Sequence, residues 1–308
     1  MELPDNLKKP YRHWNHHSFT KNNVLLQLEE FPGDKKLLKS IIVFVNERLK
    51  IWEKKALGGT PSYTRDLVLS KYRFCNIFRE FDRQTIEFHE LLNPLREDFP
   101  RWLLNMFYCR LAARPETVKL VGLLSFDKEN NQRLYSRLKE SPRPRYGTAY
   151  VFPVSAIQKS QTPTREKFLT EYLPKAIPLI SDEIEKWKRM AVFDGLEKII
   201  SIFGFNLRFL WTEVLIDVSY QFPEYIDLFG RFPIGPGALP TLRLLNQQED
   251  PSFLVSRLSE LNVDTGLTYN GKKLRLSPEN WEGIACEYRK YSNLKLGKGR
   301  KRLYVTGR

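Results

Sequence analysis

Between residues 72 and 83, polar side chains recur at the spacing of one helical face. They are Tyr72, Asn76, Arg79 and Arg83, with Asp82 beside them and Phe74, Ile77 and Phe81 on the opposite face. Because arginine binds phosphate through two parallel N–H groups, this row predicts a surface that faces an anionic ligand. The spacing alone gives equal weight to a structural role, in which Asp82 and the arginines tie the helix to its neighbours.

Two carboxylates, Glu213 and Asp217, lie one turn apart in an apolar stretch that we expect to form a helix over residues 207–222. Apolar surroundings raise the pKa of a carboxyl group, so either residue is a candidate general base or acid. From the sequence alone, a salt bridge or a solvent-facing stripe explains the pair slightly better.

A glycine–proline turn follows at residues 232–238, with Gly235 and Gly237 on either side of Pro236. Such a turn permits a ligand to approach the backbone closely. Simple punctuation between two helices would have the same sequence, so both interpretations stay open.

The net charge of +14 is concentrated at the carboxyl end. From Gly283 to Arg308 there are eight Lys and Arg residues and one acid, Glu287. Lys298, Arg300 and Arg302 alternate with glycines and Lys301, and Tyr288, Tyr291 and Tyr304 are interleaved with the cations. Cations and aromatic rings together favour binding of a nucleic acid over a solvated tail.

The sequence lacks the motifs of several classes of enzyme and binding site. The sequence has no Gly-x4-Gly-Lys-Ser/Thr phosphate loop, no Gly-x-Gly-x-x-Gly motif and no His-Glu-x-x-His motif. His13, His16, His17 and His89 are expected at the surface, and Cys75, Cys109 and Cys286 are far apart. We therefore expect no metal, cofactor or disulfide framework. Without a secretion signal or a membrane-spanning run, the protein is expected to be soluble, intracellular and free of membrane contact.

Most periodic segments predict helices, so we expect a mainly α fold with one small β-hairpin. Helices are expected at 34–57, 67–92, 99–113, 116–124, 128–140, 165–190, 193–203, 207–222 and 251–262, with a last one beginning at Ser277. Asn270-Gly271 predicts the hairpin turn. We expect residues 1–61 to form an extension with one long helix, and residues 62–308 to form the functional domain.

Four motifs occur in an order that resembles a known family. They are Ser70–Arg79 with Asp82-Arg83, Gly147-Thr148-Ala149-Tyr150, Gly235-Pro236-Gly237-Ala238, and Glu287–Tyr291 with Gly297–Arg300. Together they resemble the α-glutamyl/putrescinyl thymine pyrophosphorylases, or amino acid:DNA transferases, from about residue 62 to 304. This family is related to the helical domain of bacteriophage 5-hydroxymethyluracil DNA kinases. Cys75 departs from the threonine or serine expected in the first motif.

The resemblance implies hypermodification of thymine in double-stranded DNA. A kinase, the implied pathway partner, produces a pyrophosphate ester of 5-hydroxymethyluracil, and the transferase replaces the pyrophosphate with an amino acid or polyamine. Because the kinases need a phosphate loop, its absence here favours the transferase. The protein would act in the cytoplasm of an infected cell if viral, or in the nucleus if eukaryotic.

The resemblance also suggests a role for each candidate residue. The leaving pyrophosphate would be stabilised by Arg73, Arg79 and Arg83, with Lys290. The general base would be Asp217, or less favourably Glu213. The thymine base would be bound by Tyr72, Asn76, Asp82, Gly235 and Gly237, and the DNA backbone by Lys298, Arg300 and Arg302.

A more distant relationship to helix-hairpin-helix DNA glycosylases places the hairpin at Ile202-Phe203-Gly204-Phe205. The turn at residues 235–237 then stands near the position of the glycosylase aspartate, so we expect a flipped base to be modified rather than excised. Two alternatives remain: a glycosylase that acts on a modified pyrimidine, and a DNA-binding module without catalysis.

Overall fold

The computed structural model describes residues 1–18, 26–148, 152–204 and 206–303, and it is mainly α-helical, as the sequence predicts. The chain divides into two compact units. The first comprises Met1–Lys8, Trp14–Asp82 and Leu228–Arg308, and the second comprises Lys9–His13 and Arg83–Asp227. The domain boundary expected between residues 61 and 62 stays a prediction. No helix among the described residues is long and apolar enough to cross a bilayer.

The first unit combines elements from both ends of the chain. They are α1 (Asp5–Lys8), α2 (Trp14–His17), η1 (Leu28–Glu30), α3 (Lys35–Ala56), α4 (Leu67–Lys71), η2 (Arg79–Phe81), α14 (Leu239–Leu245), α15 (Pro251–Leu258), β3 (Thr268–Tyr269), β4 (Lys272–Lys273) and α16 (Pro278–Lys295).

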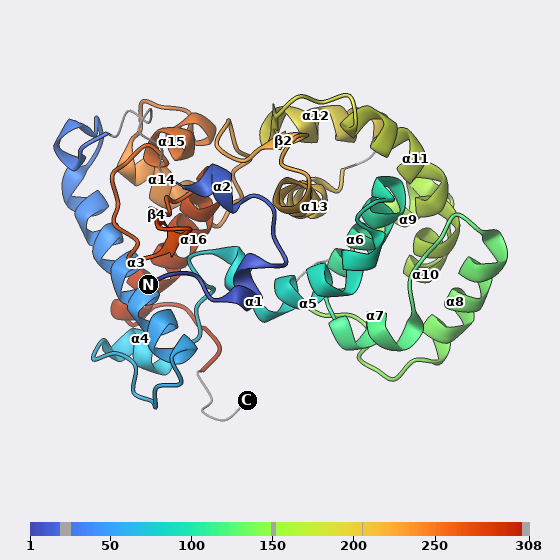
Figure 1. Cartoon of the computed structure of the whole chain (residues 1–308), viewed down its shortest axis with the longest axis horizontal. Coiled ribbons are helices and arrows are strands. Elements are labelled where there is room, and N and C mark those ends of the chain that lie inside the picture. The colour runs from blue at the N-terminus through green and yellow to red at the C-terminus, as the bar shows by residue number, and fades with distance from the viewer. Residues whose placement is uncertain (19–25, 149–151, 205, 304–308) are drawn as a thin grey trace. The chain divides into compact units, whose positions relative to one another are not determined.

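Helix α16 is the centre of the first unit. It packs against α3, α4, α14 and α15 (Figure 1), and its Trp281, Ile284 and Ala285 are buried. Ser277 caps its amino end through the side chain, as predicted. The predicted hairpin is confirmed as the antiparallel pair β3–β4, whose turn places Asn270 and Gly271 at positive φ.

The second unit contains the remaining helices of the described residues. They are α5 (Arg83–Leu92), η3 (Asn93–Leu95), α6 (Phe99–Ala112), α7 (Pro115–Val121), α8 (Lys128–Glu140), α9 (Val154–Ser160), α10 (Arg165–Lys167), η4 (Phe168–Tyr172, one turn of π-helix), α11 (Leu173–Ile184), α12 (Val192–Phe203) and α13 (Arg208–Gln221). Two short strands, β1 (Met190–Ala191) and β2 (Ile226–Asp227), pair in parallel.

Helix α6 is the centre of the second unit. Helices α5, α7, α11 and α13 pack around it (Figure 1), and twelve of its residues are buried. A helix that is apolar on all sides is typical of a core element. Helices α12 and α13 also pack together after Gly204, whose positive φ ends α12. This helix–turn–helix stands where a hairpin is expected, although Phe205 lies outside the described residues.

The predicted helix over residues 67–92 is wrong. The chain is helical only in α4, η2 and α5, and residues 72–78 between the first two are not helical. Tyr72, Asn76 and Arg79 therefore do not form a stripe along one helix. The other long helices are found close to their expected bounds, except that the helical stretch from residue 165 ends at Ile184.

Three histidines expected at the surface are buried. The ring of His13 stacks on Tyr220 at 4.4 Å, and that of His17 meets Phe229 edge-on at 5.0 Å. His89 is held in the core of the second unit by hydrogen bonds. The flat face of an imidazole ring can pack against other aromatic rings in a core. The position of a histidine in the sequence does not reveal whether it has such partners.

Candidate functional site

The carboxylate of Glu287 joins three separate segments of the first unit. Glu287 lies on α16 and is only 6% exposed. Its Oε1 accepts a hydrogen bond from Lys290 Nζ at 2.6 Å, and its Oε2 accepts from Lys301 Nζ at 2.8 Å and from the Cys75 backbone N–H at 3.1 Å. Burial opposes ionisation, but the two lysines outweigh it and hold the pKa of Glu287 below its ordinary value.

A buried arginine binds the same segment from the opposite side. Arg48 on α3 is 6% exposed, and its Nη2 donates to the carbonyl oxygens of Phe74 and Cys75 at 3.0 and 2.9 Å. Burial lowers the pKa of Arg48, and the Glu287 charge opposes that shift. Residues 74–75 are thus held by two opposite charges through their backbone groups.

These contacts explain why residues 72–78 are not a helix. The Arg73 N–H donates to the Arg302 carbonyl at 2.9 Å, and Tyr72 forms a β-bridge with Leu303. A helix would have used these backbone groups locally, whereas here their partners come from distant parts of the chain. The prediction failed because periodicity carries no information about such partners.

The basic carboxyl-terminal stretch is folded onto this segment. Lys301 lies 4.4 Å from the centre of the Phe74 ring, while Lys298, Arg300 and Arg302 are exposed. Tyr288 and Tyr291 pack against Phe44 on α3, with ring centres 5.7 and 5.0 Å apart. These two tyrosines therefore serve the core, and Tyr304 and Arg308 lie outside the described residues.

The glycine–proline turn also packs on α16. The Gly235 N–H donates to Glu282 Oε1 at 3.1 Å. A Cβ atom at Gly237 would lie 2.5 Å from Cys286 Sγ. The close backbone approach that the sequence predicts is thus made to this helix.

The remaining residues of the first motif lie in the same unit, except for Arg83. Asn76 donates from Nδ2 to Asp82 Oδ1 at 2.8 Å, and Arg79 is half-buried in η2. Arg83 belongs to the second unit, where its exposed side chain pairs with Glu87 at 2.6 Å. The structure thus brings Tyr72, Arg73 and the carboxyl-terminal stretch together.

Asp217 lies in the buried centre of the second unit. Arg110 on α6 donates to both of its oxygens at 2.5 Å, and His89 Nε2 lies 3.0 Å from Oδ1. The far side of that histidine ring faces Gln221. Asp217 is 0% exposed, whereas Glu213 is half-buried. The salt bridge that the sequence left open is therefore present at Asp217.

The second motif also lies in this unit. The Gly147 N–H donates to the Ala112 carbonyl at 2.8 Å, and a Cβ atom at Gly147 would lie 2.4 Å from the Ala113 carbonyl oxygen. Close packing against the end of α6 therefore requires glycine. Ala149 and Tyr150 lie outside the described residues.

The sequence analysis missed Arg48 as a site residue and gave Glu287 no role. A signal for each was present. Arg48 continues the buried stripe of α3 formed by Ile41, Phe44 and Val45, and Glu287 is the one acid in the basic stretch. A charge in an apolar stripe indicates a buried partner.

The cluster around Glu287 has a surplus of positive charge. Three cations, Arg48, Lys290 and Lys301, surround this carboxylate, and exposed Arg73 lies on the segment that they hold. About half of the Lys290 side chain is exposed, so an anion in solvent can reach its ammonium group. Cations of this kind bind phosphate-like anions.

Cys75 is not suited to act as a nucleophile in this cluster. Desolvation by the surrounding protein atoms, together with the charges of Glu287 and Asp82, raises the pKa of its thiol to about 12. The thiol is therefore protonated at neutral pH, although part of the residue is exposed.

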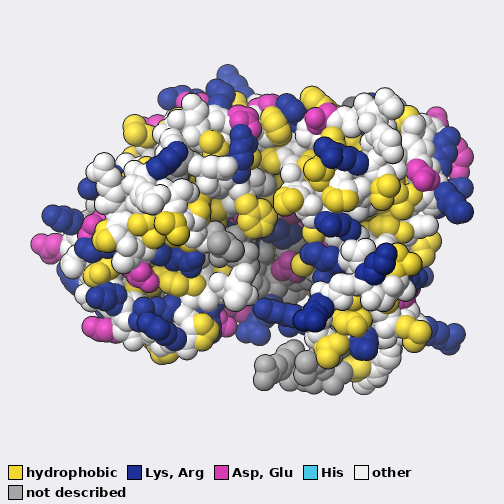
Figure 2. Space-filling model, turned by 180° about the vertical axis from the view of Figure 1, so that it is seen from behind, with side chains coloured by type: hydrophobic (Ala, Val, Ile, Leu, Met, Phe, Trp, Pro, Cys, Tyr) yellow, Lys and Arg dark blue, Asp and Glu magenta, His cyan; other side chains and the backbone are white. Residues whose placement is uncertain are grey.

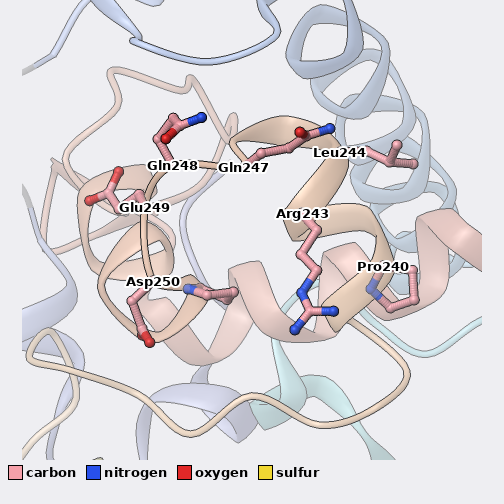
Figure 3. A pocket seen from close by; sticks show the side chains of 8 residues that line it. Pro240, Arg243, Leu244, Gln247, Gln248, Glu249 and Asp250 are labelled. Atoms are coloured by element: carbon pink, nitrogen blue, oxygen red, sulfur yellow. The ribbon is translucent and has the colours of Figure 1, made fainter.

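A separate pocket of about 700 Å³ lies between α14 and α15 (Figure 3). It is lined by Pro240, Arg243, Leu244, Gln247, Gln248, Glu249, Asp250 and Pro251. Glu249 pairs with Arg257, and Asp250 caps α15. None of the predicted site residues lines this pocket.

Comparison with known proteins places most of the chain in one family. Residues 35–301 match the family described as "5-hmdU DNA kinase, helical domain". A 5-hmdU DNA kinase from Bacillus phage SP10 is 28% identical over 81% of this chain and 44% of the relative. The chain thus spans less than half the length of that relative. No solved structure matches it significantly.

Replacing Glu287 by glutamine should destabilise the first unit most strongly at neutral pH. Removing one partner of a buried ion pair costs about 3 kcal/mol. Because the pKa of Glu287 is lowered by folding, its contribution is complete above the pKa of the unfolded chain and disappears as the pH falls through the folded-state pKa. Urea unfolding from pH 7 to pH 3 should show the gap between wild type and E287Q narrowing below about pH 5.

Glu260→Gln is the matched control, because this glutamate is exposed in the same unit. It should change the unfolding free energy by less than about 0.5 kcal/mol. A gap for E287Q that stays constant across the pH range would contradict the ion-pair interpretation.

Gly237→Ala should destabilise the turn through its contact with Cys286. The new Cβ would overlap the sulfur atom, and overpacking of this kind costs about 1–3 kcal/mol. Cys286→Ala removes the sulfur, so the double variant should regain most of the stability lost by G237A relative to C286A alone. Thermal unfolding of the four proteins measures this coupling, and strictly additive effects would show that the close contact is not responsible.

Proposed function

Because the chain belongs to the family described as the helical domain of 5-hmdU DNA kinase, we propose that it takes part in the modification of hydroxymethylated thymine in DNA. More specifically, it replaces the pyrophosphate of 5-(pyrophosphooxymethyl)uracil with an amino acid or polyamine on a flipped base. Residues 1–308 contain no phosphate loop, which supports the proposal that they catalyse a step other than phosphorylation.

The observation that carries this proposal is the surplus of cations around Glu287. Lys290 and Lys301 are fixed by that carboxylate, and Arg73 is exposed on the segment bound between Arg48 and Glu287. A leaving pyrophosphate develops negative charge as its bond to carbon breaks, and cations already in place stabilise that charge without rearranging. Arg79 is a further candidate for this role.

In the proposed reaction, the amine nitrogen forms a bond to the exocyclic methylene carbon of the base. The bond from that carbon to the pyrophosphate oxygen breaks, and the pyrophosphate leaves with the electron pair. The attacking nitrogen then gives up a proton to a general base. Tyr72, Asn76, Asp82 and the turn at Gly235–Gly237 are the proposed contacts to the base, and Lys298, Arg300 and Arg302 are the proposed contacts to the DNA backbone.

The burial of the two carboxylates on α13 supports Glu213 rather than Asp217 as the proposed base. Asp217 has no exposed surface, and Arg110 occupies both of its oxygens. Glu213 is half-buried and has surface in contact with solvent. We therefore assign the proton-accepting role to Glu213 and a structural role to Asp217. Arg83 is exposed and paired with Glu87, so it is a weaker candidate for stabilising the leaving pyrophosphate.

The phage origin of the relative supports an action on DNA inside an infected cell. There, a 5-hmdU DNA kinase would supply the phosphorylated base that this chain consumes. A second function is favoured by the family description itself, which is that of one domain of a kinase. In that case the chain would be a DNA-binding module that presents the base to a separate catalytic domain.

Incubating the full chain with duplex DNA that carries pyrophosphorylated 5-hydroxymethyluracil, together with amino acids and polyamines, tests the proposal. Nucleoside mass spectrometry should detect a thymidine adduct, with release of pyrophosphate. Arg73→Ala should slow adduct formation about a hundredfold, because one cation that stabilises the leaving group is lost. Lys39→Ala, which removes an exposed cation from α3, should leave the rate unchanged.

Three other outcomes contradict the proposal in different ways. Free base together with abasic sites would identify a glycosylase. Tight, salt-sensitive binding without any product would identify a DNA-binding module. Equal rates for R73A and K39A would remove Arg73 from the leaving-group site.

Two conservative variants separate the carboxylates of α13. Asp217→Asn should lower the unfolding free energy by about 3 kcal/mol, because Arg110 loses its buried counter-charge. Glu213→Gln should lower stability by about 1 kcal/mol or less while slowing adduct formation at least a hundredfold. Thermal unfolding and single-turnover rates measured on both variants decide the assignment, and full activity of E213Q would refute it.

A further inference from the structure

A second concentration of positive charge lies in the second unit, between residues 133 and 167. This stretch contains eight Lys and Arg residues but two acids, Glu140 and Glu166. It runs from the second half of α8 through α9 to α10 and includes the second sequence motif, for which no role has been assigned.

Arg165, near the carboxyl end of this stretch, is held between two aromatic rings. Its guanidinium carbon lies 4.3 Å from the centre of the Tyr146 ring and 5.2 Å from that of Phe152. Its N–H groups form no hydrogen bond or ion pair with a described residue. Stacking fixes the plane of a guanidinium group and leaves its in-plane donors available to an external acceptor.

The aromatic partner of Arg165 is fixed in turn. The Tyr146 hydroxyl group donates to Glu166 Oε1 at 2.9 Å. Glu166 thus orients the ring and places one negative charge beside Arg165. The guanidinium group is half-buried, so less conformational entropy is lost when it binds a ligand than for a mobile surface arginine.

Most of the neighbouring cations form no ion pair with a described acid. Arg145 donates from Nε to the Ser141 carbonyl at 3.1 Å and from Nη2 to the Lys139 carbonyl, and carbonyl oxygens neutralise no charge. Lys139 lies 5.6 Å from the Tyr135 ring, and Arg143 is exposed. Two cations of the stretch pair with acids: Lys167 with Glu171 and Arg133 with Glu129.

Alternating cations and aromatic rings are typical of surfaces that bind nucleic acids. In the view of Figure 2, lysine and arginine side chains lie among apolar and uncharged polar ones over much of the surface. A small anion would need two or three convergent donors, whereas these cations are distributed over a long stretch. Their distribution fits successive phosphates of a polymer.

We propose that Arg165, with Lys139, Arg143 and Arg145, forms a second surface that binds the phosphate backbone of duplex DNA. This inference rests on the proposed function only in taking DNA as the ligand. Tyr135 and Tyr146 position the cations of this surface. All of these residues belong to the second unit, whereas the basic carboxyl-terminal stretch belongs to the first.

Binding of unmodified duplex DNA by the full chain tests the proposal without any chemistry. In fluorescence anisotropy titrations, the double variant Lys139→Gln/Arg143→Gln should bind at least tenfold more weakly than wild type at 0.1 M salt. The slope of log K against log salt should fall by about 2, because two phosphate contacts are lost. Both side chains are exposed, so the fold should be retained.

Lys175→Gln/Lys188→Gln is the matched control, since it removes the same charge from exposed positions of the same unit outside the stretch. It should change affinity less than twofold. Arg165→Lys keeps the charge but loses the planar fork, so it should weaken binding severalfold with an unchanged salt slope.

Equal losses in the two double variants, or no DNA binding by the wild type, would overturn the proposal. The transferase reaction fails or succeeds independently of this result. If K139Q/R143Q loses affinity but the wild type yields no adduct, the surface stands and the transferase falls. If the wild type yields the adduct and the two double variants bind alike, only the surface falls.

Discussion

A single buried carboxylate determines how the first unit is assembled. Glu287 is surrounded by protein, and a charge in such a place is tolerated only when cations and hydrogen-bond donors surround it. Its partners, Lys290, Lys301 and the Cys75 N–H, come from α16, the carboxyl-terminal stretch and the first motif. Those segments therefore meet at Glu287. The exposed cations Lys298, Arg300 and Arg302 belong to the same carboxyl-terminal stretch as Lys301 and are anchored with it.

The second unit also contains a buried carboxylate, but its charge is balanced in a different way. There Arg110 and Asp217 neutralise each other at the buried centre, with His89 beside them. The group is closed to solvent, so it stabilises the helices around α6 and has no charge to offer a ligand. Around Glu287, by contrast, the cations outnumber the acid and Lys290 remains partly exposed. Burial of the carboxylate is common to both clusters, but only the cluster around Glu287 retains a surplus of charge that an anion can reach.

The sequence predicted those parts of the fold that depend on neighbouring residues. Helices α3, α8 and α16 and the Asn270-Gly271 hairpin follow from caps, periodicity and turn chemistry, all of which act over a few residues. Residues 72–78 have helical periodicity but bind Arg48, Glu287 and the carboxyl-terminal stretch instead. The same limit applies to His89 and Asp217, which are 128 positions apart in the sequence. Local patterns cannot anticipate a partner that the tertiary fold supplies.

The distribution of charge has a consequence for how affinity is generated. The carboxyl-terminal stretch and residues 133–167 together account for nearly all of the net charge of +14, so the rest of the chain is close to neutral. In both stretches key cations are already fixed: Lys301 by Glu287 and the Phe74 ring, and Arg165 by two aromatic rings. The entropy of ordering these side chains is lost when the chain folds rather than when a ligand binds. A polyanion therefore meets cations that are already in position, and mutations in the residues that hold them will act on binding through order as well as through charge.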